Sequence, residues 1–103
     1  MIDKIKSFNE NKKVHEKPMP VSARIMDIQS ELGELSKEYL KSTNYGTKEF
    51  CVSEDFELEF ADVLYSMISL GQEAEIDIER SVEKVLEKYQ KRIDEKKNMG
   101  SGR

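Results

Sequence analysis

Two segments of the chain carry the same spacing of acidic residues. The first reads Glu31-Leu-Gly-Glu34-Leu and the second reads Glu59-Phe-Ala-Asp62-Val. Residues three apart on an α-helix lie on one face, so each segment would present its two carboxylates together. If both segments are helical and their apolar stripes pack against each other, the four carboxylates converge along one seam.

Such a convergence predicts a bound divalent cation, because clustered carboxylates repel one another. Oxygen ligands without Cys or His suit Mg²⁺, with Mn²⁺ as a substitute, better than Zn²⁺. The expected ligands are the four acidic side chains of the two motifs: Glu31, Glu34, Glu59 and Asp62. A single such pair would be uninformative, since acidic pairs are common on solvated helix faces. We interpret Glu38, one turn further on, as solvated.

Other chemistries have few residues to use. Cys51 is the only cysteine and His15 the only histidine, which excludes a Cys-based zinc site and makes a Ser-His-Asp triad hard to assemble. We interpret Cys51 as a small apolar residue in a loop and His15 as exposed. The cation site is therefore the main candidate for chemistry.

Helical segments are needed to position the motifs, and the apolar spacing predicts two in the first half of the chain. A short helix near the N-terminus carries apolar residues three apart, and Pro18 and Pro20 separate it from a longer helix that starts near Val21. The segment 44–46, Asn-Tyr-Gly, favours a helix end. The apolar stripe of the longer helix is Val21, Ile25, Ile28, Leu32, Leu35 and Tyr39.

Two more helices are expected in the second half. Ser53 is a predicted N-cap for a helix with the stripe Phe56, Phe60, Val63, Met67 and Leu70. After a connection over 71–77, Asp77 caps a fourth helix. No segment alternates as a strand does. The predicted fold is an all-α four-helix bundle over residues 1–97, with a mobile tail over 98–103.

Chain length and hydropathy indicate the compartment and the oligomeric state to expect. The chain has 103 residues, a mean hydropathy of −0.71 and no apolar run long enough for a membrane span. Lys4, Lys6 and Asn9 interrupt the N-terminus, so we read no signal peptide and expect the cytoplasm. A core this small is marginal, and we expect an oligomer.

Charge is unevenly distributed along the chain. Net charge is +3 over residues 1–26, −11 over 27–79 and +4 over 80–103, which gives −4 overall. An acidic protein with this layout lacks the basic stripe that nucleic-acid binding requires. Lys84, Lys88 and Arg92 recur every four residues and could present positive charge to the phosphates of a ligand, or could pair with Glu83, Glu87 or Asp94 on a wet surface.

The motifs together resemble the MazG-like, all-alpha nucleoside triphosphate pyrophosphohydrolase superfamily. The resemblance is carried by Glu31-x-x-Glu34, a gap of 24 residues, and Glu59-x-x-Asp62. It continues into the segment 76–79, Ile-Asp-Ile-Glu, and the basic positions of the last helix, and it covers roughly residues 21–97. One departure is Ser30, where many members have a glutamate.

This resemblance implies Mg²⁺-dependent cleavage of a nucleoside triphosphate to a monophosphate and pyrophosphate, by a homodimer or homotetramer. One carboxylate must take the proton of the attacking water, and Glu31 and Glu34, which begin the first motif, are the candidates for this catalytic role. The resemblance favours Lys88 and Arg92, with Lys84 less strongly, as phosphate ligands. Tyr45 is a candidate contact to the base. Two alternatives stay open: a pyrophosphohydrolase for another nucleotide, such as phosphoribosyl-ATP or a nucleotide sugar, and a non-enzymatic helical dimerisation or regulatory module.

Overall fold

The chain folds into helices only, over the residues that the structure describes. The computed structural model describes the backbone of residues 1–101 and the side chains of residues 1–98. Within them lie four helices and no strand: α1 (Ile2–Lys13), α2 (Val21–Ser42), α3 (Glu54–Glu73) and α4 (Ile78–Ser101). The all-α class and the four helices are thus confirmed. Helix α4 continues through the residues that we assigned to the tail, of which 102–103 lie outside the described part.

Local sequence signals place most of the helix ends. The Ser53 hydroxyl accepts a hydrogen bond from the Phe56 N–H at 3.0 Å, and Asp77 Oδ1 accepts one from the Arg80 N–H at 3.1 Å. Both caps were predicted, because short polar side chains satisfy the free N–H groups of a first turn. The segment 44–46 takes positive φ angles of 46°, 57° and 86° and ends the turn after α2. Helix α3 ends at Glu73, three residues past the end that we predicted.

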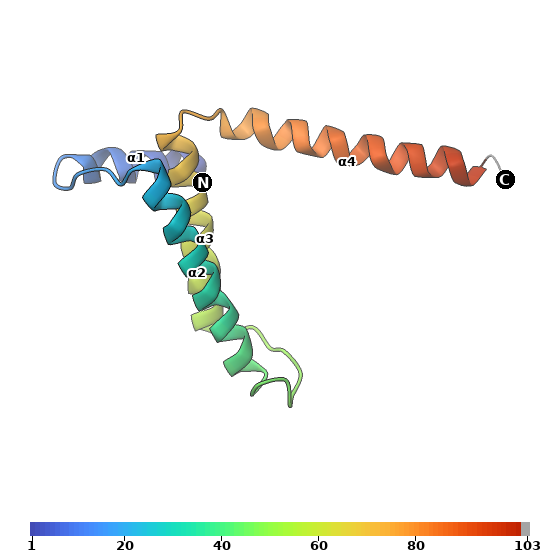
Figure 1. The fold of residues 1–103 in the computed structure, drawn as a ribbon, viewed down its shortest axis with the longest axis horizontal. Helices are drawn as coiled ribbons and strands as arrows, with labels where there is room; N and C mark the ends of the chain where they lie inside the picture. Colours follow the sequence, from blue (N-terminus) through green and yellow to red (C-terminus); the bar gives the residue numbers. More distant parts are fainter. Residues whose placement is uncertain (102–103) are drawn as a thin grey trace.

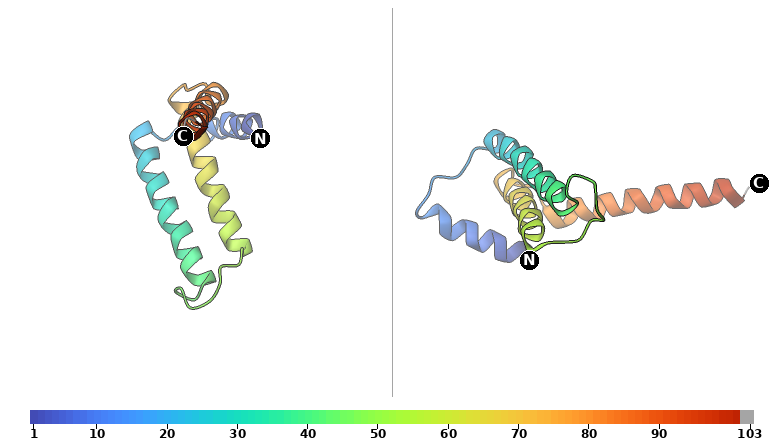
Figure 2. Two further views of the ribbon diagram at one scale, coloured as in Figure 1. Left: turned by 90° about the vertical axis from the view of Figure 1, so that its right-hand side faces the viewer. Right: turned by 90° about the horizontal axis from the view of Figure 1, so that it is seen from below.

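The helices do not close into a bundle within one chain. Helices α2 and α3 form a long antiparallel hairpin, α1 crosses one end of α3, and α4 projects away (Figure 1; Figure 2). Across the described residues α4 contacts only α3, and Ile78 at its start packs on Gly71. The radius of gyration is 18.4 Å, whereas a compact chain of this length has about 13 Å. The predicted four-helix bundle is therefore wrong for the isolated chain.

The hairpin seam is built from a heptad register in which half the positions are polar. Seam positions follow alternating steps of three and four, the pattern of two helices packed side by side. All of them are at least partly buried: Arg24, Ile28, Glu31, Leu35, Glu38 and Ser42 on α2, with Phe56, Glu59, Val63, Ser66, Leu70 and Glu73 on α3. Polar groups thus occupy the contact that we expected the apolar stripes to make.

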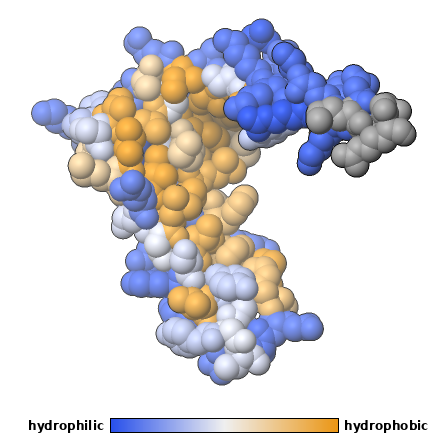
Figure 3. Space-filling view, turned by 45° about the vertical axis from the view of Figure 1, so that its right-hand side comes forward, coloured by the Kyte–Doolittle hydropathy of each residue, from blue (hydrophilic) through white to orange (hydrophobic). Residues whose placement is uncertain are grey.

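The predicted apolar stripes are instead largely open. Ile25, Leu32 and Tyr39 follow seam residues of α2 by one position, and Phe60 and Met67 do the same on α3. A step of one residue turns 100° about each axis, and because the helices are antiparallel both steps point to the same side of the hairpin. These five side chains, the open apolar face, are 46–58% exposed. Figure 3 shows apolar surface gathered over the hairpin.

Helix α1 packs on the opposite side of α3 and is held mainly by polar contacts. The Asn9 amide donates to Ser69 Oγ at 3.0 Å and to Gln72 Oε1 at 2.9 Å, and its oxygen accepts from the Tyr65 hydroxyl at 2.6 Å. Ser69 is fully buried. Phe8 adds an edge contact to Tyr65, with ring centroids 6.1 Å apart. This network covers one side of α3 and leaves the open apolar face uncovered.

The space around Gly33 shows whether another backbone packs closely against α2 at this position. Gly33 stands between the two acids of the first motif, where a residue without a side chain would permit a close approach of another helix, but a Cβ added there meets nothing within 4 Å. We expect Gly33→Ala to raise the free energy of unfolding by about 0.5–1 kcal/mol, since alanine is the better helix former. Urea denaturation measures the change. A loss of stability would contradict the expectation and would place a second backbone against this position.

None of the described helices combines the length and apolar content that a bilayer crossing requires.

Candidate metal centre

Three acidic side chains meet on the seam of the hairpin. Glu31 comes from α2, and Glu59 and Asp62 come from α3. Each offers a carboxylate oxygen, and these oxygens all lie within 4.8 Å of one another. Glu31 and Glu59 are partly buried and Asp62 is exposed. The heptad register explains the meeting, because Glu31 and Glu59 occupy seam positions and Asp62 lies one turn from Glu59. We call these three residues the carboxylate trio.

The surroundings of Glu31 and Glu59 disfavour their charged forms. Partial burial raises the pKa of Glu31 above its ordinary value, and the charge of Asp62 raises it further. The pKa of Glu59 is raised by the same two causes in the same order. Smaller contributions come from acidic neighbours along the seam, which are Asp27 and Glu34 for Glu31, and Glu34, Glu38 and Asp55 for Glu59. Among residues 1–98, whose side chains the structure describes, no basic group pairs with the trio, so a cation there would relieve the repulsion.

The donor set fits a hard divalent ion. Adjacent ligands of an octahedral Mg²⁺ lie about 3.0 Å apart and opposite ligands about 4.2 Å, since each Mg–O distance is about 2.1 Å. The oxygens of the trio, which lie within 4.8 Å of one another, would move closer together on binding, and their side chains are open enough to solvent to do so. Every donor is a carboxylate oxygen, which suits Mg²⁺ or Mn²⁺. The exposed side of Asp62 leaves space for water or a phosphate oxygen.

Glu34, the fourth predicted ligand, lies outside the trio. Its side chain is 51% exposed and pairs with Lys37 at 3.5 Å. Its charge still raises the pKa of Glu31 and of Glu59, so it lies near the same seam. Glu38, which we took as solvated, is only 16% exposed and pairs with Lys41 at 3.3 Å. The acidic seam therefore extends one turn further than we expected.

The predicted phosphate ligands are not brought to the trio within one chain. Lys84, Lys88 and Arg92 lie on the projecting part of α4, which has no contact with α2 in the described residues. They also do not pair with the acidic residues suggested as alternatives, because Glu83 and Glu87 contact Arg80 and Asp94 accepts from Gln90. Arg92 instead lies 5.9 Å over the ring of Tyr89.

Tyr45 lies in the loop after α2 and is 73% exposed. Fourteen residues separate it from Glu31, and α2 spans most of them, so the two are about 20 Å apart along the helix. Within one chain, Tyr45 is not near the trio.

Sequence reasoning missed a buried ion pair at the other end of the hairpin. Arg24 and Glu73 lie on the seam, with Arg24 Nη2 3.1 Å from Glu73 Oε1. The signal was present, since Arg24 precedes the buried Ile28 by one helical turn and so shares its face. A charged residue on a buried face indicates a partner.

A scan against protein-family models, a search of curated proteins and a search of solved structures each gave no match.

Proposed function

We propose that this protein is a Mg²⁺-dependent nucleoside triphosphate pyrophosphohydrolase, which converts a (d)NTP and water to a (d)NMP and pyrophosphate. The observation that carries the proposal is the carboxylate trio on a partly buried seam, which brings together three of the four acidic residues of the repeated motifs. The resemblance of those motifs to the MazG-like superfamily supplies the reaction. A divalent ion held there would neutralise phosphate charge and lower the pKa of a bound water.

The residues of the chain take distinct parts in this proposal. Glu31 and Glu59, on facing helices, would hold the ion together with Asp62 at the exposed edge of the trio. A divalent ion lowers the pKa of a carboxylate that binds it, so Glu31 would act as a ligand. Glu34 is half exposed and near the same seam, and its carboxylate could leave Lys37 and accept the proton of the attacking water.

A second copy of the chain belongs to the proposal, as a homodimer or homotetramer. The open apolar face and the apolar side chains of α4 support it, since Val82, Val85, Leu86, Tyr89 and Ile93 are all 42–59% exposed. Contiguous apolar surface of this kind marks an interface. The excess positive charge of residues 80–103 complements the acidic hairpin, so the α4 of a partner could bring the basic positions that the trio lacks in one chain.

The direct test is a panel of (d)NTPs assayed for pyrophosphate with Mg²⁺ and again with EDTA. We expect release from at least one member of the panel, and its loss on chelation. Release of orthophosphate alone, or release that persists in EDTA, would contradict the proposal. Phosphoribosyl-ATP and a nucleotide sugar in the same panel test the other pyrophosphate-bearing substrates.

A non-enzymatic dimerisation module is the second candidate, and the unpacked α4 favours it. A helix whose apolar side chains are half exposed along its length is built to pack on another protein. A folded protein that associates but releases no pyrophosphate from any member of the panel would support this candidate.

A further inference from the structure

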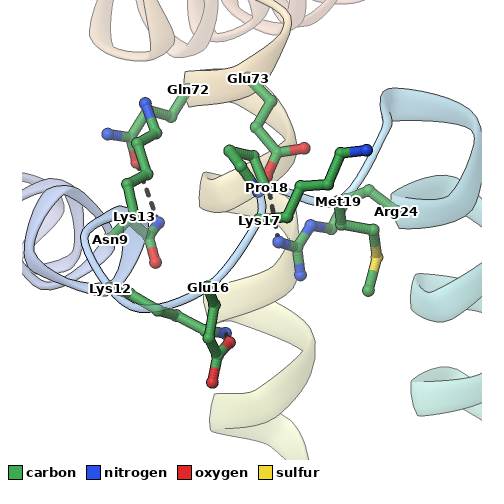
Figure 4. A pocket seen from close by; sticks show the side chains of 10 residues that line it. All are labelled: Asn9, Lys12, Lys13, Glu16, Lys17, Pro18, Met19, Arg24, Gln72 and Glu73. Carbon is green, nitrogen blue, oxygen red and sulfur yellow. Dashed lines mark hydrogen bonds and ion pairs between the residues drawn. The ribbon is translucent and has the colours of Figure 1, made fainter.

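A second polar site lies at the end of the hairpin remote from the loop 43–53. There the end of α1, the segment 14–20 and the first turn of α2 meet the last turn of α3 around a cavity of about 110 Å³ (Figure 4). Six charged side chains line it and sum to a net charge of +2: Lys12, Lys13, Glu16, Lys17, Arg24 and Glu73. An otherwise acidic molecule thus has a positively charged cavity.

The wall of the cavity contains a buried donor and a buried acceptor that lack partners. Arg24 and Glu73 have side chains only 10% and 17% exposed, and one hydrogen bond joins them. Among the described residues, Arg24 Nε and Glu73 Oε2 are buried and bond to no other group. Leaving such atoms unpaired is unfavourable. The site is therefore suited to a ligand that accepts from the guanidinium and donates to the carboxylate.

The lysines around this pair are available to an anion. Lys17 forms no ion pair within the described part of the chain, and it projects beside Arg24 (Figure 4). Lys12 and Lys13 pair with Glu16 and Glu10 at 3.5 and 3.3 Å, but these pairs are largely exposed to solvent. Exposed pairs within one helical segment contribute little and are readily exchanged.

We propose that this cavity binds a protonated phosphate group. When Arg24 and Glu73 turn towards the cavity, the unprotonated phosphate oxygens accept hydrogen bonds from Arg24 Nε and from the Lys17 ammonium, and the P–OH donates to Glu73 Oε2. Guanidinium groups are well suited to phosphate oxygens. Sulfate has the same shape but carries no proton near neutral pH, so it would place an oxygen against the Glu73 carboxylate without a hydrogen between them. The site should therefore distinguish phosphate from sulfate. This proposal is independent of the trio and of its reaction.

Isothermal titration of the full chain with inorganic phosphate and with sulfate, at equal ionic strength and in EDTA, tests the proposal. We expect phosphate to bind at least tenfold more tightly than sulfate, and Glu73→Gln to reduce that ratio to about twofold or less, because an amide can donate to sulfate. Equal binding of the two anions by the wild type, or binding of neither, would overturn the proposal.

Surface variants test whether phosphate binds at this site or is only attracted by positive charge on the surface. Lys17→Gln removes an exposed ammonium without disturbing the buried pair, and we expect it to weaken phosphate binding at least threefold. Lys48→Gln, in the exposed loop after α2, is the matched control and should leave the affinity unchanged. An equal loss in both variants would show attraction to net charge alone and would contradict a defined site.

The phosphate group can belong to free phosphate or to a phosphate monoester, and a third titration distinguishes them. Glycerol phosphate carries the same protonated group on a small organic body. Tighter binding than inorganic phosphate would identify an organic phosphate as the ligand, whereas its exclusion would identify free phosphate. Failure of both to bind would overturn the proposal.

Discussion

Glu59→Gln is expected to lose Mg²⁺-dependent pyrophosphate release by at least about 100-fold, since replacing even an outer partner of a metal site costs 10- to 100-fold. The same variant should melt at a higher temperature than the wild type in EDTA. Glu59 lies beside Asp62 on α3 and opposite Glu31 on α2, and burial together with the charge of Asp62 raises its pKa. Removing one charge relieves the repulsion. Activity and thermal unfolding measure the two effects.

The stability gain should depend on pH in a defined direction. Because the pKa of Glu59 in the folded chain lies above its ordinary value of 4.5, the charged carboxylate destabilises the folded state at neutral pH. That penalty decreases as pH falls through the folded pKa and is gone below 4.5, where Glu59 is protonated in both states. The difference in melting temperature between variant and wild type in EDTA should therefore shrink on acidification.

The matched control for Glu59→Gln is Glu57→Gln. Glu57 is exposed in the first turn of α3 and lies outside the trio. It should keep activity, and it should gain no stability, because an acid near a helix N-terminus is favourable. A fully active Glu59→Gln, or one that melts lower than the wild type in EDTA, would contradict the proposed site.

Phe60→Asp is expected to dissociate the proposed oligomer, with a dissociation constant raised at least about 100-fold. Phe60 is 58% exposed in one chain, so a change there should cost the isolated chain little. In an assembly that covers the open apolar face, the substitution would bury an unpaired carboxylate. Sedimentation velocity at several protein concentrations measures the association.

Leu58→Asp provides the matched control for Phe60→Asp. Leu58 is 59% exposed and stands on the other side of Glu59, one position before the seam rather than one after it. It therefore points away from the open apolar face, towards the side on which α1 packs. Dissociation by Leu58→Asp but not by Phe60→Asp would contradict the prediction, because it would place the interface on the side of the hairpin opposite the open apolar face. If the partner also supplies the basic residues of α4, Phe60→Asp should lose pyrophosphate release together with association.

Sequence was a good guide to local structure. Ser53 and Asp77 indicate where helices start because their side chains cap free N–H groups, and these contacts join residues only three apart in the sequence. The meeting of Glu31, Glu59 and Asp62 was also predictable, because it needs only two antiparallel helices in the right register. The two acidic motifs stand at matching positions of their apolar stripes, so the acids come close together once the two helices are known to pair.

The seam itself could not be predicted, for a physical reason. A helix with a broad apolar stripe can bury either its centre or its edge, and the hydrophobic effect does not depend on direction. In this chain the edge faces the partner helix, which places Glu38 in the seam and leaves Leu32 open. The position of α4 could not be predicted either, because its exposed apolar side chains cover no surface of the same chain. The periodicity of α4 indicates that one face is buried, but it does not say which surface buries that face.

The contact between Ile78 and Gly71 is where α4 is joined to the rest of the chain. Everything beyond that joint is oriented by a single small patch, whereas α1, α2 and α3 hold one another through their own contacts. Helix α4, which would contact a partner, and the α2–α3 hairpin, which holds the carboxylate trio, can thus move independently of each other. Such a division allows one to be altered, by substitution or by natural variation, while the other keeps its shape.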